Sequence, residues 1–171
     1  IYTTPKCALW AGLGLGKTVI CLTALSELMF EEMAIERVLV IAPKRVAEHT
    51  WTTEAAKWEH LKHLRISKVM GSPKQRLEAL KAEADIYIIN RENVQWLVGQ
   101  YGTTWPFDCV VIDELSSFKS AKSQRFKALR MIRPRIARMI GLTGTPASNG
   151  LLDLWAQLYL LDQGQRLGKT I

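Results

Sequence analysis

The sequence predicts an α/β domain of three layers, with a mainly parallel central sheet between two layers of helices. Short, largely apolar segments alternate with longer segments in which apolar residues recur every three or four positions. Strands that are apolar on both faces need cover on both sides, and parallel sheets receive that cover from helices. Glycine-rich or polar residues directly follow several of the strands, where open parallel sheets bind their ligands.

Six short apolar segments, bounded by glycine, proline or polar residues, indicate strands at residues 7–10, 37–41, 66–69, 86–89, 109–112 and 139–142. Helical spacing of apolar residues predicts helices at residues 17–30, 44–58, 74–82, 93–98 and 151–161. In the second helix, Trp51, Ala55 and Trp58 share a face that we expect to pack in the core. In the third helix, we expect Leu77 and Leu80 to point inward.

A glycine-rich loop at residues 11–18 joins the first strand to the first helix and predicts a phosphate-binding site. Glycines let backbone N–H groups turn inward and approach an anion. Lys17 is then expected to reach the β- and γ-phosphates of ATP or GTP, and the Thr18 hydroxyl to bind Mg²⁺. The nucleotide-binding residues are Gly12, Leu13, Gly14, Leu15, Gly16, Lys17 and Thr18.

The loop departs from the strict phosphate-binding pattern because Ala11 stands where that pattern has glycine. The alternative is a glycine-rich turn followed by an ordinary helix. Residues 167–170 repeat the letters of residues 15–18, but they follow a polar stretch and leave no room for a helix. We therefore interpret the second copy as chance.

Two further motifs follow strands and are expected at the same edge of the sheet, together with residues 42–44 and 90–91. Asp113 would hold Mg²⁺, and Glu114 would orient the attacking water, which favours hydrolysis over phosphoryl transfer. The alternative is two acids that cap the next helix. The segment 143–146 places two hydroxyls and a glycine beside them; alone it indicates a turn, and with the other motifs it indicates a sensor of the nucleotide's state.

Composition limits the class of protein. At 171 residues with 48% hydrophobic content, the chain suits one well-buried domain. Cys7, Cys21 and Cys109 lie in apolar segments, which favours reduced core residues over disulfides. No segment suits a membrane span and no signal peptide opens the chain, so we expect a cytoplasmic protein without a membrane partner. The chain starts at Ile1, and we expect it to be part of a longer protein.

The net charge of +7 is concentrated in one segment, residues 119–138, which carries eight basic residues and no acidic one. Such a run can be a solvated helix face. It can also contact a nucleic-acid backbone, with an affinity that falls steeply as salt rises. The charges alone leave both alternatives open.

The motifs together resemble a known family. A-x-x-G-x-G-K-T, then Asp-Glu after an apolar strand, then Leu-Thr-Gly-Thr-Pro-Ala-Ser-Asn followed by Leu-x-x-Leu-Trp, is similar to the first RecA-like lobe of superfamily-two helicases, in particular the Swi/Snf group. The resemblance covers nearly the whole chain. It implies a RecA-like P-loop NTPase lobe at residues 1–161, the start of a linker at 162–171, and ATP-driven translocation on duplex DNA.

The resemblance also implies roles for individual residues. The phosphate loop is motif I, Asp113 and Glu114 are motif II, and Thr143 to Pro146 are motif III. Contacts with DNA are expected from Pro43, Lys44, Arg45, Arg91 and Lys119. Coupling between ATP and DNA is expected from Ser116, Thr143, Gly144 and Thr145.

Two departures from the family pattern matter. Ser116 stands where the group commonly has histidine, so it can form hydrogen bonds but cannot titrate near neutrality, and this form is similar to phage versions. The family's adenine-binding glutamine motif would precede Ile1, and its second lobe would follow Ile171. Three hypotheses remain: a DNA motor lobe, a nucleotide- and DNA-binding module without catalysis, and an unrelated P-loop enzyme such as a small-molecule kinase, which motif III argues against.

Overall fold

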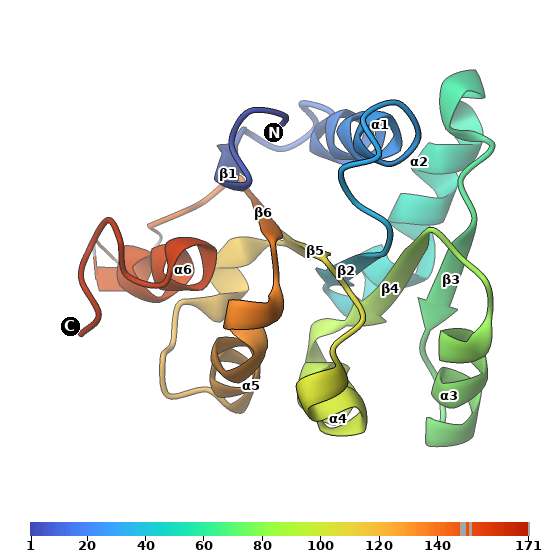
Figure 1. The fold of residues 1–171 in the computed structure, drawn as a ribbon. Coiled ribbons are helices and arrows are strands. Elements are labelled where there is room, and N and C mark those ends of the chain that lie inside the picture. The colour runs from blue at the N-terminus through green and yellow to red at the C-terminus, as the bar shows by residue number, and fades with distance from the viewer. Residues whose placement is uncertain (148–149, 151, 171) are drawn as a thin grey trace.

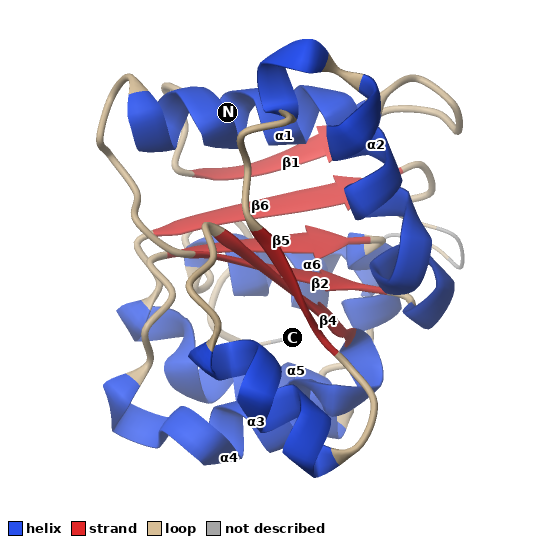
Figure 2. Ribbon diagram, turned by 90° about the vertical axis from the view of Figure 1, so that its right-hand side faces the viewer, coloured by secondary structure: helices blue, strands red, loops and turns tan. Residues whose placement is uncertain are grey.

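The computed structural model describes residues 1–147, 150 and 152–170 of the chain. Figures 1 and 2 show a sheet between two layers of helices, and the arrowheads of the strands all point to the same side in Figure 2. The strands are β1 (Lys6–Trp10), β2 (Val38–Ala42), β3 (Ile66–Val69), β4 (Ile86–Asn90), β5 (Cys109–Asp113) and β6 (Arg138–Thr143). Their order in the sheet is β1-β6-β5-β2-β4-β3, and every neighbouring pair is parallel. The predicted fold class is therefore confirmed.

Five of the six α-helices in the described part of the chain lie close to predicted helices, whereas α5 was not predicted as a helix. The helices are α1 (Lys17–Phe30), α2 (Trp51–Lys57), α3 (Pro73–Lys81), α4 (Val94–Tyr101), α5 (Gln124–Ile132) and α6 (Leu152–Asp162). The predicted helix at 44–58 is helical from Lys44 to Lys57, but a π-helical turn, Val46–Thr50, interrupts the α-helix before α2. Part of the basic segment forms α5, and residues of the 151–161 prediction other than Leu151, which lies outside the described residues, fall in α6.

The central strands are buried on both faces. In β2, Val38, Val40 and Ala42 belong to the core beneath α1 and α2, whereas Leu39 and Ile41 belong to the core beneath α4, α5 and α6. This alternation follows from the two-residue period of a strand. Burial on both sides explains why the strand is an uninterrupted apolar run rather than an alternating one.

Two side chains predicted to lie in the core are exposed. Trp51 and Ala55 are buried as expected, but Trp58 is 44% exposed because α2 ends at Lys57 and the next residue is extended. In α3, Leu80 is buried, but Leu77 is 41% exposed. Arg76 takes the inward position instead and lies over the ring of Trp96, with its guanidinium carbon 4.1 Å from the ring centroid.

The three cysteines of the chain are not joined in disulfides. Cys7, Cys21 and Cys109 are free thiols, of which the last two are fully buried, and burial raises their pKa.

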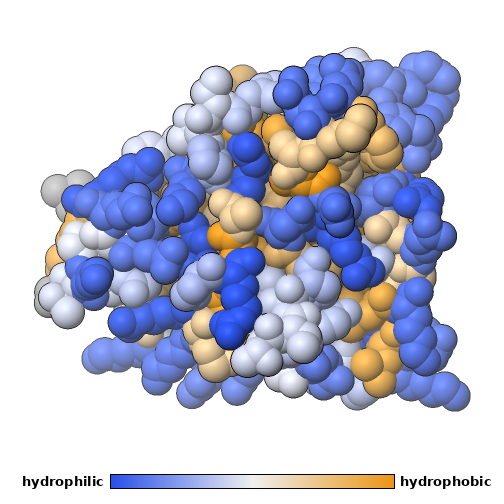
Figure 3. All heavy atoms as spheres, in the orientation of Figure 1, coloured by the Kyte–Doolittle hydropathy of each residue, from blue (hydrophilic) through white to orange (hydrophobic). Residues whose placement is uncertain are grey.

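Each helix in the described part of the chain is too short or too polar to cross a bilayer. In the view of Figure 3, most of the surface is hydrophilic and the hydrophobic areas between are small.

Candidate nucleotide-binding site

The glycine loop connects β1 to α1 at the carboxyl edge of the sheet. Gly14 and Gly16 have φ angles of 74° and 73°, in the left-handed region where a Cβ is strained. Gly16 is the N-cap of α1, and no side chain caps the first N–H groups of that helix. Those N–H groups and the positive end of the helix dipole are the elements with which proteins bind phosphate.

Lys17 is the first residue of α1, and its side chain folds back over the loop. The Nζ atom donates hydrogen bonds to the carbonyl oxygens of Ala11 and Gly12, each at 2.7 Å. The ammonium group is therefore held at the predicted phosphate-binding loop. Its neighbours are carbonyl dipoles rather than a carboxylate, so its charge is not neutralised by these contacts.

The three predicted motifs line one cavity of about 410 Å³. Its walls are Leu13, Lys17, Thr18, Val46, Thr50, Asp113, Glu114, Ser116, Thr143, Gly144 and Thr145. Lys17 and Asp113 thus share a single hollow, as the nucleotide hypothesis requires. Val46 and Thr50 come from the π-helical turn before α2 and were not predicted as site residues, because their sequence carries no motif.

Asp113 ends β5 and is partly buried. Its Oδ2 atom accepts a hydrogen bond of 2.9 Å from Nε1 of Trp51. Burial raises the pKa of the Asp113 carboxyl, and the Trp51 bond opposes that change. Sequence reasoning assigned Trp51 only to the core; nothing in the apolar stripe of its helix indicates a contact with the carboxylate.

Glu114 follows with a φ of 56°, which is uncommon for a residue with a side chain. Its side chain is 56% exposed, and its Oε2 atom lies 3.7 Å from Nη1 of Arg91. Glu114 does not cap a helix through its side chain. Its position beside Asp113 on the cavity wall leaves the carboxylate open to solvent.

The residues predicted for coupling connect the acidic pair at 113–114 with the phosphate loop. Thr143 Oγ1 donates to Oγ of Ser116 at 3.4 Å and accepts from the backbone N–H of Thr145 at 3.2 Å. The backbone N–H of Ala11 donates to the Thr143 carbonyl at 3.2 Å. A Cβ at Gly144 would lie 3.3 Å from the Ala11 oxygen, so glycine lets this segment approach the phosphate loop closely.

The residues predicted to bind DNA fall into two groups. Pro43, Lys44 and Arg45 directly follow β2, and the last two are exposed; Lys44 Nζ lies 3.9 Å from Glu48. Arg91 follows β4 and is 28% exposed, with Nε donating to Glu92 at 3.2 Å. Lys119 instead lies 3.8 Å from Asp153 of α6, so it is paired within the domain.

The basic segment is not one continuous binding face. Arg133 is 1% exposed and donates to the carbonyl oxygens of Leu160, Leu161 and Ile136. Burial lowers the pKa of Arg133, and Asp162 opposes that change. Arg138 donates to the carbonyl of Ile1 at 2.7 Å. Arg133 is therefore neither part of a solvated helix face nor exposed for contact with a nucleic acid; it is a structural residue inside the domain.

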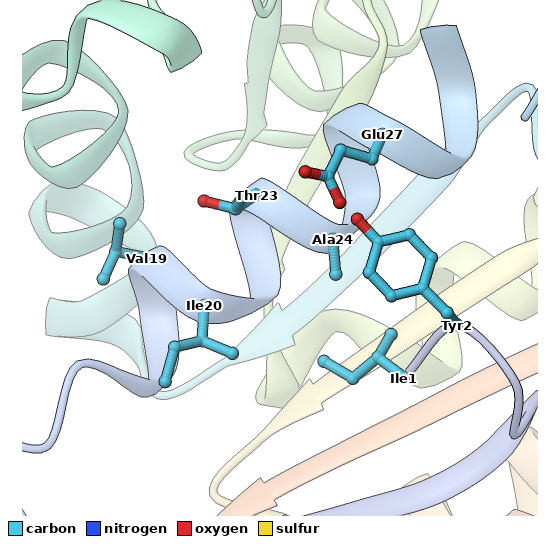
Figure 4. A pocket seen from close by; sticks show the side chains of 7 residues that line it. All are labelled: Ile1, Tyr2, Val19, Ile20, Thr23, Ala24 and Glu27. Atoms are coloured by element: carbon cyan, nitrogen blue, oxygen red, sulfur yellow. The ribbon is translucent and has the colours of Figure 1, made fainter. Parts of the chain in front are cut away.

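A second hollow, of about 370 Å³, lies on the outer face of α1 (Figure 4). Ile1 and Tyr2 lie there beside Ile20, Ala24 and Glu27 of the helix, and Val19 and Thr23 complete the lining. None of the predicted site residues lines it. It is therefore distinct from the cavity of the three motifs.

The parallel sheet, the glycine loop before α1 and the acidic pair at the end of β5 define a RecA-like P-loop NTPase domain. More specifically, the chain belongs to the SNF2-related domain family, which matches residues 4–166. This confirms the resemblance to the Swi/Snf group.

Individual relatives agree with this assignment. The chain is 45% identical to putative protein p41 of Acyrthosiphon pisum secondary endosymbiont phage 1, over 94% of this chain and 36% of that protein. It is 33% identical to a mouse DNA excision repair protein ERCC-6-like, over 91% and 13% respectively. The SWI2/SNF2 ATPase core of Sulfolobus solfataricus, solved in complex with dsDNA, matches with a TM-score of 0.78 and 25% identity, over 95% and 32%. The chain therefore spans about a third or less of the length of these proteins.

Proposed function

We propose that this chain is the ATP-binding lobe of a DNA-dependent ATPase that hydrolyses ATP to ADP and phosphate and moves along duplex DNA. The observation that carries the proposal is the single cavity lined by Lys17, Thr18, Asp113 and Glu114. An ammonium, a hydroxyl and two carboxylates in one hollow are the groups that phosphoryl chemistry with a divalent cation requires.

The residues present fit ATP and magnesium. The loop offers uncapped N–H groups and backbone at positive φ, both suited to phosphate. The hydroxyl of Thr18 and the carboxylate of Asp113 are oxygen ligands of the kind that magnesium prefers. When bound, the ion neutralises charge on the phosphate oxygens.

Each side chain then has a defined task. Lys17 binds the β- and γ-phosphates and stabilises the charge that develops on them during hydrolysis. Thr18 and Asp113 hold the ion, and Glu114 orients and polarises the attacking water. The bonds among Ser116, Thr143 and Thr145 connect the acidic pair to the phosphate loop, which supports a role in sensing the nucleotide.

The DNA backbone is proposed to run along the carboxyl edge of the sheet. Residues 43–45 follow β2 and Arg91 follows β4; these strands are neighbours in the sheet, so Lys44, Arg45 and Arg91 all lie at the same edge of the sheet. The duplex DNA in the Sulfolobus complex supports this choice of partner. Lys119 remains a proposed contact that would have to leave Asp153. We also propose that residues 1–161 form one lobe and that residues 162–171 begin the connection to a second.

The test is ATP hydrolysis with and without duplex DNA, on this chain and on a longer protein that includes a second lobe. We expect this chain to bind ATP with magnesium weakly and to hydrolyse it slowly, and the longer protein to be stimulated by DNA. A longer protein that binds both ligands but never hydrolyses ATP would favour the binding module. Hydrolysis by the longer protein that does not respond to DNA would contradict the proposed DNA-dependent motor activity.

A further inference from the structure

Trp51 joins the helix after β2 to the end of β5. The side chain is completely buried, and its indole Nε1 donates to Oδ2 of Asp113 at 2.9 Å. A tryptophan used only for packing would need no particular acceptor, although a buried N–H does need some partner. The partner here is the carboxylate proposed to hold magnesium.

The backbone directly before Trp51 departs from α-helical geometry. The π-helical turn Val46–Thr50 ends immediately before it. A π-helical turn holds more residues than an α-helical one, so it changes the direction in which the following side chains point, and such turns are frequent at functional sites. Val46 and Thr50, at the two ends of the turn, line the nucleotide cavity. The π-helical turn therefore lines the nucleotide cavity, and the Trp51 indole bonds to a residue that lines the same cavity.

The contact also fixes the orientation of the carboxylate. A hydrogen bond to one oxygen restrains rotation of the carboxyl group, and the indole ring that provides it is rigid and enclosed by the core. Groups that hold a metal ligand in this way normally strengthen metal binding.

We infer that Trp51 is a positioning residue that holds Oδ2 of Asp113 and thereby presents Oδ1 to the magnesium ion of the nucleotide site. This inference rests on the proposed function of Asp113. A second consequence is that the helical segment carrying Trp51, whose π-helical turn begins directly after the proposed DNA-contacting residues Lys44 and Arg45, is linked by a hydrogen bond to the metal ligand.

The first test measures metal binding directly. Mn²⁺, used as a spectroscopic probe for Mg²⁺, is titrated in the presence of ADP and followed by electron paramagnetic resonance. Trp51→Phe keeps most of the ring volume and removes the donor, so we expect Mn²⁺ affinity to fall roughly tenfold or more. The affinity for ADP without metal should stay within about twofold, because the indole touches the carboxylate rather than the phosphate loop.

Trp58→Phe is the matched control. Trp58 lies just beyond the same helix, and its indole also donates to a carboxylate, Oε2 of Glu54, at 3.3 Å. It is exposed and does not line the cavity. Its replacement should leave Mn²⁺ affinity unchanged. If Trp51→Phe does not fold, benzothienylalanine at position 51 keeps the shape of the indole and replaces only the N–H by sulfur.

The second test follows the indole itself. The chain has six tryptophans, and the Trp51 resonance in a ¹H–¹⁵N spectrum is assigned from its loss in Trp51→Phe. We expect this resonance to shift most of the six when Mg²⁺ is added with ADP, and to shift in Asp113→Asn without metal. An indole resonance that ignores both changes would overturn the inference.

The outcomes separate the two proposals. If Asp113→Asn binds Mn²⁺ like the unmodified chain, the proposed metal site itself is wrong. If Asp113→Asn loses Mn²⁺ but Trp51→Phe binds it as well as Trp58→Phe does, the metal site stands and the positioning role of Trp51 is rejected.

Discussion

Nη1 of Arg91 lies 3.7 Å from Oε2 of Glu114, so an arginine at the end of β4 faces the carboxylate that follows β5. The same guanidinium donates through Nε to Glu92 at 3.2 Å. In the proposed function, Arg91 contacts DNA phosphate and Glu114 orients water. A phosphate that competes for the guanidinium would weaken its contact with Glu114 and leave that carboxylate free to contact water.

Arg91→Ala is therefore expected to raise ATP hydrolysis without DNA and to reduce the stimulation by DNA. A partly exposed ion pair contributes about 0.2–1 kcal/mol, which limits the increase to roughly fivefold at low salt. The salt dependence of DNA binding should decrease by about one released counterion. The measurement is steady-state hydrolysis in the longer protein, with and without duplex DNA, at two salt concentrations.

Lys81→Ala provides the control for that change. Lys81 also forms an ion pair, with Glu78 at 3.1 Å, but both residues belong to α3 and neither lines the nucleotide cavity. This variant should keep the rates of the unmodified protein. A DNA-free rate for Arg91→Ala that is equal to or below the control would remove Arg91 from any coupling role.

Lys17→Ala tests the phosphate loop, and residues 167–170, which repeat its Leu-Gly-Lys-Thr sequence, provide the control. Hydrolysis should fall by at least roughly a hundredfold, because a preorganised charge at the phosphates is lost. The midpoint of thermal unfolding should hardly change, since Lys17 is only partly buried and bonds to loop carbonyls. Lys169→Ala alters the second Leu-Gly-Lys-Thr, which is exposed and forms no helix, and should leave hydrolysis intact. Equal losses in both variants would show that the loop assignment is wrong.

Glu114→Gln separates binding from turnover. The amide keeps the size of the side chain but cannot polarise water, so turnover should fall by about 10²–10⁴-fold while ATP affinity is retained. Single-turnover hydrolysis and equilibrium ATP binding measure the two quantities. Glu92→Gln, on the other side of Arg91, changes a carboxylate that does not line the cavity and should leave turnover close to that of the unmodified protein. Normal turnover in Glu114→Gln would exclude Glu114 as the group that orients water.

Much of the site could be predicted from the sequence because it depends on the ends of parallel strands. Once the apolar runs before Asp113 and before the glycine loop are recognised as parallel strands, their carboxyl ends must share an edge of the sheet. That conclusion needs only the alternation of strands and helices along the sequence, not the order of the strands within the sheet. The roles of Lys17 and Asp113 remain predictions, but their common cavity follows from this geometry.

Other features depend on information that the sequence pattern does not carry. The contact of Arg91 with Glu114 requires β4 and β5 to flank β2, and the order of strands within a sheet cannot be read from periodicity. Trp51 was recognised as buried, but an apolar stripe does not reveal where an indole N–H points. The sequence predicts Trp58 in the core because a helix extended by one residue would bury it, whereas α2 ends at Lys57.

Arg133 shows how a charge run can hide a structural residue, and it supports a final prediction. Its buried guanidinium donates to the carbonyls of Leu160 and Leu161 near the end of α6, where a cation also favours the helix dipole. Arg133→Ala should lower the free energy of unfolding by about 2–4 kcal/mol, because buried carbonyls lose a charged donor. Arg135→Ala, two residues along and exposed, should leave it unchanged. Urea unfolding measures the difference, and DNA affinity is compared where both variants are folded. If Arg133→Ala is as stable as Arg135→Ala but binds DNA more weakly, Arg133 belongs to the DNA-binding surface after all.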